Sequence, residues 1–261
     1  MNILFIGDIV GKVGRRVVSE QLPIIKAKYD IDFVVANGEN VTHGKGLSIK
    51  HYLELKSYGI DCVTMGNHYL RNRDVFAYRK EYIDMVRPAN MYPDIPGKLF
   101  KDFTVKGKNI RIINVLGRAF LDGANDNPYD TVENLRNLPV KPDMVFVDFH
   151  AESTAEKMIM GKVFDGKITG VVGTHTHTQT NDARILPNGT AFISDLGMCG
   201  YYDGVLGVKP EGAIQRTWKG EPSRFDVPET GRGSFNGLVM HVDEEMIRVT
   251  ELTLINRVDK E

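Results

Sequence analysis

The stretch ITGVVGTHTH, residues 168–177, is an apolar run that ends in two histidines one residue apart. The run is continuously apolar rather than alternating, which is typical of a strand in a parallel sheet that is covered on both faces. In extended backbone, residues two apart point the same way. We therefore expect His175 and His177 to project together from the end of a buried strand, while Thr176 points away.

Four other short apolar runs occur along the chain, at residues 3–6, 33–36, 62–65 and 144–147. Residues 15–29 and 48–58 carry apolar side chains at helical spacing, and Ser48 is a predicted N-cap. Strands that alternate with helices predict βαβ units. The predicted fold class is therefore α/β, a sandwich with mixed, centrally parallel sheets flanked by helices.

Later segments alternate apolar and polar residues, as antiparallel strands do. Residues 103–105 and 110–115 predict a hairpin that turns at residues 106–109, and residues 237–242 and 247–255 predict two more strands. The segment 196–235 is rich in Gly and Pro, and we expect long ordered loops there. The sequence shows neither an internal repeat nor a linker, so residues 1–261 are expected to form a single domain.

The composition is that of a globular protein without a strong electrostatic preference. Of 261 residues, 42% are hydrophobic and 26% are charged, and 33 Lys and Arg nearly balance 34 Asp and Glu. This balance argues against nonspecific binding to nucleic acid or to a membrane surface. Cys62 and Cys199 are too few for a disulfide framework and suit a reducing compartment. The first residues lack a signal-peptide pattern, so a cytoplasmic location is expected.

Potential metal ligands follow each of the five apolar runs. In open parallel sheets, ligands bind beyond the carboxyl ends of the strands, so these side chains are expected to meet in one crevice. A single Asp or Asn at a strand end is commonly a turn former, but five such coincidences favour a shared site. The candidate ligands are Asp8, Glu39, Asn40, Asn67, His150, His175 and His177.

This set offers carboxylate and amide oxygens and imidazole nitrogens, with no thiolate. Such donors suit iron or manganese, with zinc as an alternative, and suit magnesium less well because of the imidazoles. Seven ligands are too many for one tetrahedral ion but suit two ions that share a carboxylate. Glu39 is the natural bridge, because two ions about 3.5–4 Å apart need an anion between them.

The same residues lie in motifs that resemble those of the calcineurin-like metallophosphoesterases, whose usual signature reads D-x-H, G-D-x-x-D, G-N-H-D/E, a later His, and G-H-x-H. The chain departs from this signature at GDIVG, where Val10 stands in place of a His, and at NGEN, where Glu39 replaces the bridging Asp. These departures match the YmdB-type bacterial phosphodiesterases. Nearly the whole chain resembles that branch, in order through HGKGL, MGNH, RPAN, DFHAE, VVGTHTHTQT, RILPNGTA and DLGM.

The resemblance implies a metallophosphoesterase-like fold and hydrolysis of cyclic nucleotides at a binuclear iron- or manganese-type site. The 2′,3′-cyclic nucleotides are the main expected substrates, and 3′,5′-cyclic ones are further candidates. By the same resemblance, one ion is held by Asp8, Glu39, Asn40 and His177, and the other by Glu39, Asn67, His150 and His175. His68 has no ion in this scheme. We also expect a homo-oligomer.

Charge balance favours a phosphodiester over a monoester. Two divalent ions are neutralised by Asp8, Glu39, a bridging hydroxide and a monoanionic diester, whereas a dianionic monoester would leave net negative charge. The leaving ribose oxygen needs a proton, and His68 is the predicted general acid, a role typically worth about 10²–10⁴ in rate. The alternative for His68 is a hydrogen bond that holds the Asn67 loop.

The segment THGKG, residues 42–46, follows Glu39 and supplies two predicted substrate contacts, His43 and Lys45. Its glycines would let backbone amides approach a phosphate, or would simply form a flexible turn. Two other functions stay open. A binuclear amidohydrolase also uses an H-x-H pair, although there the pair follows the first strand. A regulatory metalloprotein would act mainly through an RNA-decay or signalling partner.

Overall fold

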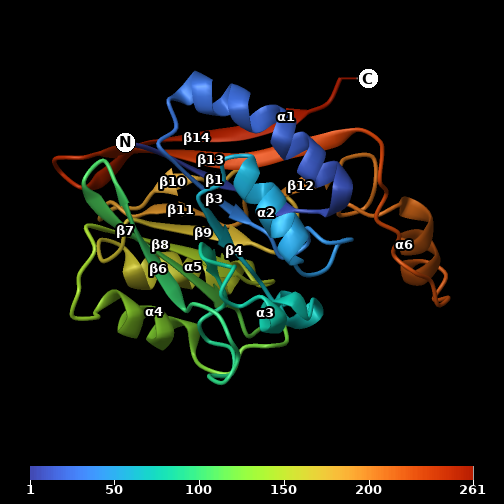
Figure 1. Cartoon of the computed structure of the whole chain (residues 1–261), viewed down its shortest axis with the longest axis horizontal. Coiled ribbons are helices and arrows are strands. Elements are labelled where there is room, and N and C mark those ends of the chain that lie inside the picture. The colour runs from blue at the N-terminus through green and yellow to red at the C-terminus, as the bar shows by residue number, and fades with distance from the viewer. Residues whose placement is uncertain (261) are drawn as a thin grey trace.

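Two β-sheets lie face to face between two layers of helices in the computed structural model, which describes residues 1–260 (Figure 1). The first sheet contains, in spatial order, β2 (Asp8–Ile9), β12 (Met198–Tyr201), β13 (Gly233–Asp243), β1 (Asn2–Ile6), β3 (Phe33–Asn37), β4 (Cys62–Thr64) and β5 (Met85–Val86), with β14 (Arg248–Val258) paired to β13. The second sheet contains β10 (Arg184–Ile185), β11 (Ala191–Ile193), β9 (Gly170–Thr174), β8 (Met144–His150), β7 (Lys108–Leu116) and β6 (Phe100–Val105).

Helices cover the outer face of each sheet. The helices are α1 (Gly11–Tyr29), α2 (Ile49–Ser57), α3 (Asp74–Ala77), α4 (Pro128–Arg136), α5 (Thr154–Phe164) and α6 (Pro210–Thr217), together with a short 3-10 helix, η1 (Tyr69–Arg71). Helices α1 and α2 pack on the first sheet, and α4 and α5 pack on the second. The predicted α/β sandwich with mixed, centrally parallel sheets is confirmed.

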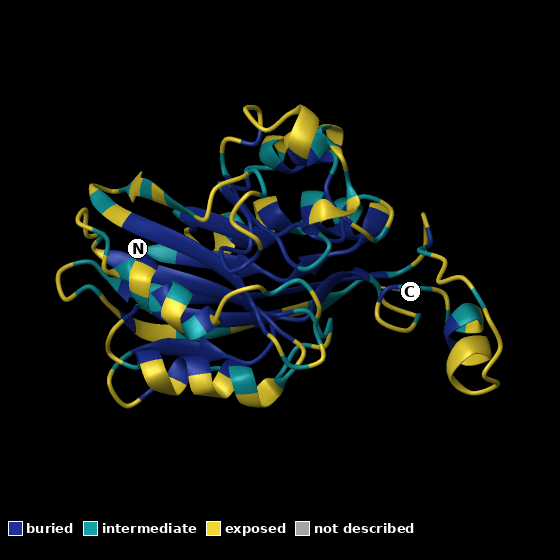
Figure 2. Cartoon of the chain, turned by 90° about the horizontal axis from the view of Figure 1, so that it is seen from below, coloured by how far each residue is buried: buried dark blue, intermediate teal, exposed yellow. Residues whose placement is uncertain are grey.

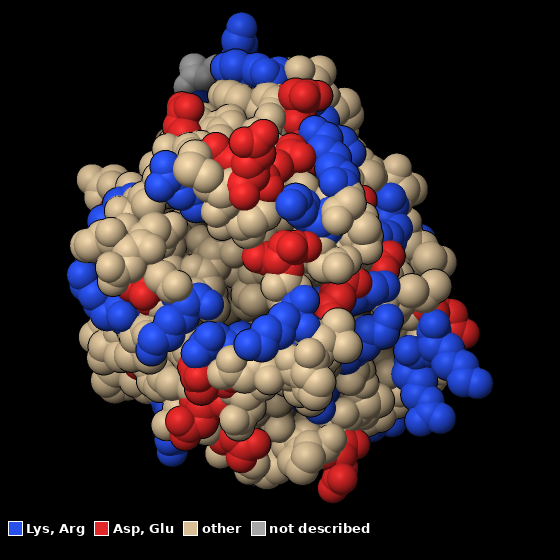
Figure 3. Space-filling view, turned by 90° about the vertical axis from the view of Figure 1, so that its left-hand side faces the viewer, with Lys and Arg blue, Asp and Glu red and all other residues tan. Residues whose placement is uncertain are grey.

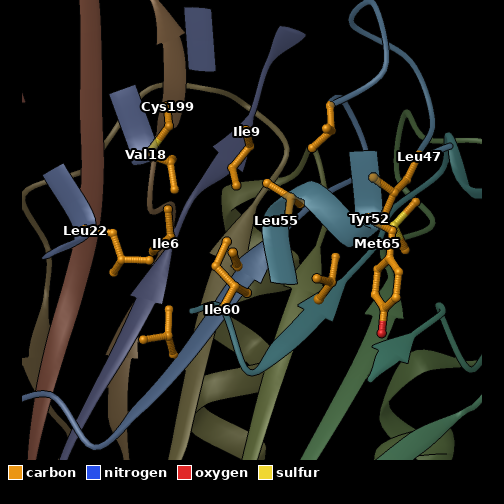
Figure 4. Packing of buried hydrophobic residues seen from close by; sticks show 14 of the residues in the cluster. Ile6, Ile9, Val18, Leu22, Leu47, Tyr52, Leu55, Ile60, Met65 and Cys199 are labelled. Carbon is orange, nitrogen blue, oxygen red and sulfur yellow. The ribbon is translucent and has the colours of Figure 1, made fainter. Parts of the chain in front are cut away.

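Burial on both faces explains why the strand sequences are continuously apolar. In β1, Ile3 and Phe5 point into the layer between the two sheets, whereas Leu4 and Ile6 join the cluster beneath α1 and α2. Figure 4 shows this second cluster, with Ile6 of β1 between side chains of both helices. Figure 2 shows the central strands mostly buried and the helices that cover the sheets exposed on their outer sides, whereas the strands β6, β10 and β14 carry exposed residues.

Most of the predicted elements are present, with shifted ends. Helix α1 begins four residues before the predicted start. Its first turn lies close to β12, since a Cβ at Gly14 would lie 2.3 Å from the Cys199 carbonyl oxygen. The predicted N-cap Ser48 accepts a hydrogen bond from the His51 amide. Strands β6 and β7 are joined by Lys106 and Gly107 alone, both at positive φ, which gives a tighter turn than predicted.

The expectation of loops throughout residues 196–235 was wrong. This segment contains β12 and α6. Strand β12 has only four residues, and α6 has eight, so neither is long enough to show a clear apolar period in the sequence. Helix α6 stands at the end of the molecule where α1 begins, apart from the helices that cover the sheets (Figure 1).

The surface carries charges of both signs. Figure 3 shows the left-hand side of Figure 1, where Lys and Arg side chains lie among Asp and Glu side chains. This mixture agrees with a formal net charge of −1. Among the described helices, none combines the length and apolar character that a membrane crossing requires.

Candidate metal centre

The seven predicted ligand residues come together where the parallel strands of both sheets end. Asp8 follows β1, Glu39 and Asn40 follow β3, and Asn67 follows β4 in the first sheet; His150 ends β8, and His175 and His177 follow β9 in the second. The crevice therefore lies between the ends of two facing sheets rather than along one sheet edge. The apolar runs in the sequence do not distinguish a site at one sheet from a site between two sheets, because the strands are covered on both faces in either arrangement.

Glu39 lies at the centre of the cluster, and its side chain is 1% exposed. Its Oε1 accepts a hydrogen bond from Asn40 Nδ2 at 3.1 Å, and its Oε2 lies 3.3 Å from His150 Nε2. One carboxylate oxygen thus faces each of the two predicted ligand sets. Gly66 leaves the room for this arrangement, since a Cβ there would lie 2.1 Å from Glu39 Oε2.

Each of the three histidines turns one ring nitrogen into the cluster and the other onto an acceptor outside it. His150 Nε2 lies 3.1 Å from both Asn67 Oδ1 and His175 Nδ1. His177 Nε2 lies 3.0 Å from Asn40 Nδ2. The outward nitrogens contact Thr174 Oγ1 at 2.9 Å, a Glu152 carboxylate oxygen at 3.2 Å and the Leu206 carbonyl oxygen at 3.0 Å, for His150, His175 and His177 respectively. Such outer hydrogen bonds orient the histidine ligands of metal sites.

The geometric reason predicted for His175 and His177 was wrong, although both reach the cluster. Strand β9 ends at Thr174, and the two histidines have positive φ values of 106° and 63°. Their backbone is therefore a loop rather than extended strand. A buried carboxylate holds this loop: Asp195 accepts from the Thr176 amide at 3.0 Å and pairs with Lys157 Nζ at 2.7 Å.

A buried chain of hydrogen bonds behind His150 was not predicted from the sequence. Thr174 Oγ1 contacts His150 Nδ1 and donates to Asp148 Oδ1 at 2.7 Å. Asp148 also accepts from Asn37 Nδ2 at 3.1 Å and from the hydroxyl of Thr64. The only signal in the sequence is an acidic residue inside the apolar run MVFVDF, where a strand covered on both faces has no reason for one.

Asp8 provides a direct test of whether a cation fits this donor set. Its side chain is fully buried, and Oδ2 accepts from the His175 amide at 3.1 Å. Its Oδ1 is one of two buried side-chain polar atoms among the described residues that have no hydrogen-bond partner. Buried carboxylate oxygens without partners are costly unless a cation satisfies them. The donor set therefore fits metal ions.

The pKa shifts of the cluster reflect both burial and the attraction between its carboxylates and imidazoles. Burial raises the pKa of Asp8 to about 6. Burial also opposes ionisation of Glu39, but His150 and then His68 outweigh it and hold the pKa of Glu39 well below its usual value. Burial lowers the pKa of His150, yet the carboxylates of Glu39 and Asp8 raise it to about 9. Burial and the neighbouring His150 lower the pKa of His175 to about 3. The carboxylates of Glu39 and Asp8 thus stabilise positive charge on His150.

Asn40 connects the cluster to His68. The Asn40 Oδ1 atom lies 2.8 Å from His68 Nδ1, so ligation by this oxygen requires a half turn of the amide, which exchanges oxygen and nitrogen. The His68 backbone amide donates to Glu39 Oε2 at 3.1 Å. Within the described chain, His68 Nε2 has no hydrogen-bond partner, and the residue lines the adjoining cavity.

A cavity of about 470 Å³ opens onto the cluster. Its lining includes Glu39, Asn40, His68, His175 and His177, and also the predicted contacts His43 and Lys45. The loop that carries these two contacts uses its own amides internally: Lys45 donates to the Thr42 carbonyl and Gly46 to the Glu39 carbonyl. The idea that these amides bind phosphate is therefore wrong for Lys45 and Gly46, and the Lys45 side chain remains as the candidate.

A second cavity, of about 490 Å³, lies at the opposite ends of β8 and β9. Arg136, Lys141, Lys167 and Arg248 contribute to its lining. Asp143 is the one carboxylate among its described lining residues, and no histidine lines it. Among the described residues, Glu39, His150 and His175 form a cluster of potential metal ligands, and Glu39 and His175 line the first cavity rather than the second.

Comparison with known proteins extends the similarity over nearly the whole chain. The YmdB-like protein family matches residues 4–255. The 2′,3′-cyclic-nucleotide 2′-phosphodiesterase of Bacillus subtilis (strain 168) is 42% identical over 255 residues, which cover 98% of this chain and 96% of that protein. The crystal structure of a novel phosphatase from Mycoplasma pneumoniae has a TM-score of 0.93 at 37% identity and covers 99% of this chain and 93% of its own. A hypothetical protein from Thermus thermophilus has a TM-score of 0.92 at 36% identity, with 100% of both chains covered.

Proposed function

The chain belongs to the YmdB-like protein family, and from this membership we propose that it is a metal-dependent phosphodiesterase that hydrolyses cyclic nucleotides. The 2′,3′-cyclic nucleotides are the proposed substrates, and 3′,5′-cyclic nucleotides are further candidates. The relative from Bacillus subtilis carries the corresponding name. The observation in this chain that carries the proposal is the orientation of His150, His175 and His177. Each turns one ring nitrogen into the cluster and the other onto an outer acceptor.

Two transition-metal ions, iron or manganese with zinc as the alternative, are proposed to occupy the cluster. The first is assigned to Asp8, Glu39, Asn40 and His177, and the second to Glu39, Asn67, His150 and His175. Asp8 Oδ1, which has no hydrogen-bond partner among the described residues, and the divergent oxygens of Glu39 support this assignment. When bound, such ions polarise phosphoryl oxygens and lower the pKa of water toward about 7, which supplies the nucleophile for in-line attack.

The protein's own part in the reaction is positioning and proton transfer. His68 is proposed as the general acid that protonates the leaving ribose oxygen. Its Nδ1 faces the side-chain amide of Asn40, which leaves Nε2 as the nitrogen for the substrate. Lys45, at the cavity wall, is proposed to contact the phosphate, and His43 lines the same cavity.

Elemental analysis coupled to a substrate panel tests the proposal. We expect two transition-metal ions per chain and faster hydrolysis of cyclic diesters than of monoesters. Glu39→Gln should lose metal and hydrolysis while it keeps the fold, as judged by circular dichroism. A clear preference for monoesters would overturn the diesterase assignment.

The role of His68 is tested by comparing leaving groups. For His68→Gln we expect a loss of about 10²–10⁴ in rate on a 2′,3′-cyclic nucleotide, the usual contribution of a general acid. The loss on bis(p-nitrophenyl) phosphate should be much smaller, because nitrophenolate leaves without a proton. Equal losses on both substrates would assign His68 to holding the Asn67 loop instead.

A further inference from the structure

The proposed function assigns residues to the phosphate and to the leaving ribose oxygen of the substrate, but it assigns none to the nucleobase. We propose that residues 203–229, here called the α6 lobe, form the opposite wall of the substrate cleft, and that Leu206 and Phe225 contact the nucleobase of a cyclic nucleotide. The inference rests on the proposed function, because it assigns the base of the same substrate. The surface would favour substrates that carry a base over those that lack one, and it contains none of the predicted metal ligands.

The metal cluster and the α6 lobe line the same cavity. Its lining runs from Glu39 and His175 in the metal cluster to Val205, Leu206 and Phe225 in the lobe. Its volume of about 470 Å³ lies within the range of about 300–1,000 Å³ that is usual for small-molecule sites. A molecule whose phosphate lies at Glu39 therefore has the lobe as the neighbouring wall.

The lobe presents apolar side chains that the protein itself leaves uncovered. Leu206 is 53% exposed and Phe225 is 47% exposed, although both line a cavity. Among the described residues that the lobe contributes to this lining, Thr217 is the one with a polar side chain. Apolar surface beside a polar centre is suited to a planar, uncharged ring, and base–aromatic contact is largely independent of base identity.

Contacts with the metal loops hold the lobe in place. The Leu206 carbonyl oxygen accepts from the ring of His177 at 3.0 Å. Val227 occupies the space where side chains of Gly11 and Gly44 would lie: a Cβ at either glycine would come within 2.5 or 2.6 Å, respectively, of a Val227 methyl group. The wall is thus fixed relative to the cluster at two points.

The ring of Phe225 is also supported from within the lobe. The Arg216 guanidinium lies over this ring, 5.2 Å from its centroid. The backbone beside it is fixed as well, because the Lys209 amide donates to the Asp226 carbonyl oxygen at 2.8 Å. A ring held in this way offers a contact surface without a large loss of side-chain entropy on binding.

The test compares a nucleotide with a diester that lacks the base. Adenosine 2′,3′-cyclic phosphate and 1-O-methylribose 2′,3′-cyclic phosphate share the reacting group and differ only in the base. Phe225→Ala should raise KM for the adenosine substrate roughly 5- to 150-fold, in line with the cost of losing a base–aromatic contact. KM for the methylriboside and kcat for both should stay within about twofold. The four common bases should give similar KM values in the parent protein.

Two control variants separate base contact from general damage. Trp218→Ala removes an aromatic ring from the same lobe, but Trp218 is 81% exposed and is not among the described residues that line the cavity. It should leave both KM values unchanged. Phe225→Tyr keeps the ring and should restore most of the affinity for the nucleotide.

The outcomes distinguish this inference from the proposed function. Absence of diester hydrolysis by the metal-loaded parent would overturn the proposed function; calorimetric binding of adenosine 3′-monophosphate to parent and Phe225→Ala would then test the base contact alone. An equal rise of KM for both substrates in Phe225→Ala would overturn the base contact, as would unchanged values for both. A change of oligomeric mass in Phe225→Ala, without a selective change in nucleotide affinity, would assign the surface to a second copy of the chain and would also overturn it.

Discussion

Gly66→Ala is the sharpest test of the cluster geometry, because it adds one methyl group at its centre. A Cβ at this position would lie 2.1 Å from Glu39 Oε2 and 2.5 Å from His150 Nε2. The φ angle of Gly66 is outside the positive region that disfavours L-residues, so the backbone itself accepts alanine. The strain therefore falls on the two side chains.

The magnitude follows from the distances. To regain van der Waals separation from the new methyl group, the Glu39 carboxylate must retreat by roughly 1 Å. A displacement of about 1 Å in catalytic geometry costs about 10²-fold in rate. Disturbed support of metal ligands costs about 10- to 100-fold in metal affinity. We expect losses of this size in kcat/KM and in the affinity for Mn²⁺ measured by calorimetric titration.

Gly161→Ala is the matched control for Gly66→Ala. Its Cβ would lie 2.7 Å from a ring carbon of Phe192, within the core beneath α5 and away from the cluster. This variant should change the thermal unfolding temperature while metal affinity stays as in the parent. Full retention of two ions and of activity by Gly66→Ala would refute the close approach of Glu39 and His150 on which the site is built.

Three further predictions concern the supports of the site. Thr174→Val removes the hydroxyl behind His150, and we expect about a 10- to 100-fold loss of metal affinity by calorimetry; an unchanged affinity would mean that packing alone orients the ring. Lys157→Met leaves the Asp195 carboxylate buried without its cation, so the free energy of unfolding should fall by about 3–5 kcal/mol in chemical denaturation. Adding Asp195→Asn should recover part of that loss, and no recovery would count against the pair. Chelation should destabilise the metal-loaded parent, and Mn²⁺ at about 100 times its Kd should restore about 2.7 kcal/mol for each ion bound; an identical response in Glu39→Gln would contradict the bridging role.

The gathering of the predicted ligand residues at one place could be foreseen because each follows a recognisable buried strand. Asp8, Glu39, Asn67, His150 and His175 all come directly after or at the end of an apolar run. Polar side chains at those points have no place in the core, and the topology of parallel strands gathers them at one end. The number of sheets was not predictable in the same way, since a neighbouring sheet and a neighbouring helix impose the same apolar pattern on a strand.

The roles of the residues that orient the predicted ligands could not be predicted from the sequence. Asp148 lies within a strand and Lys157 inside a helix, so neither marks the end of an element in the sequence pattern. Thr174 is the last residue of β9, but a threonine is an ordinary strand residue and does not stand out there. Their roles depend on pairings across the fold, such as Lys157 with Asp195, that no local pattern records.

The predicted single domain, homo-oligomer, cytoplasmic location and RNA-decay partner stay predictions.

The polar network beneath the cluster explains how two separate sheets can build one site. An apolar interface between sheets has little directional preference, so packing alone tolerates small sliding movements. Asp148 of β8 removes that freedom: it accepts hydrogen bonds from Asn37 of β3 and Thr64 of β4 in the first sheet and from Thr174 of β9 in its own. Burial raises the pKa of Asp148, but these donors favour its ionised form. Because Thr174 also contacts His150, the registration of the two sheets and the orientation of a central imidazole are set by the same carboxylate. The buried carboxyl group of Asp148 thus fixes the two sheets relative to each other at the point where both contribute residues to the site.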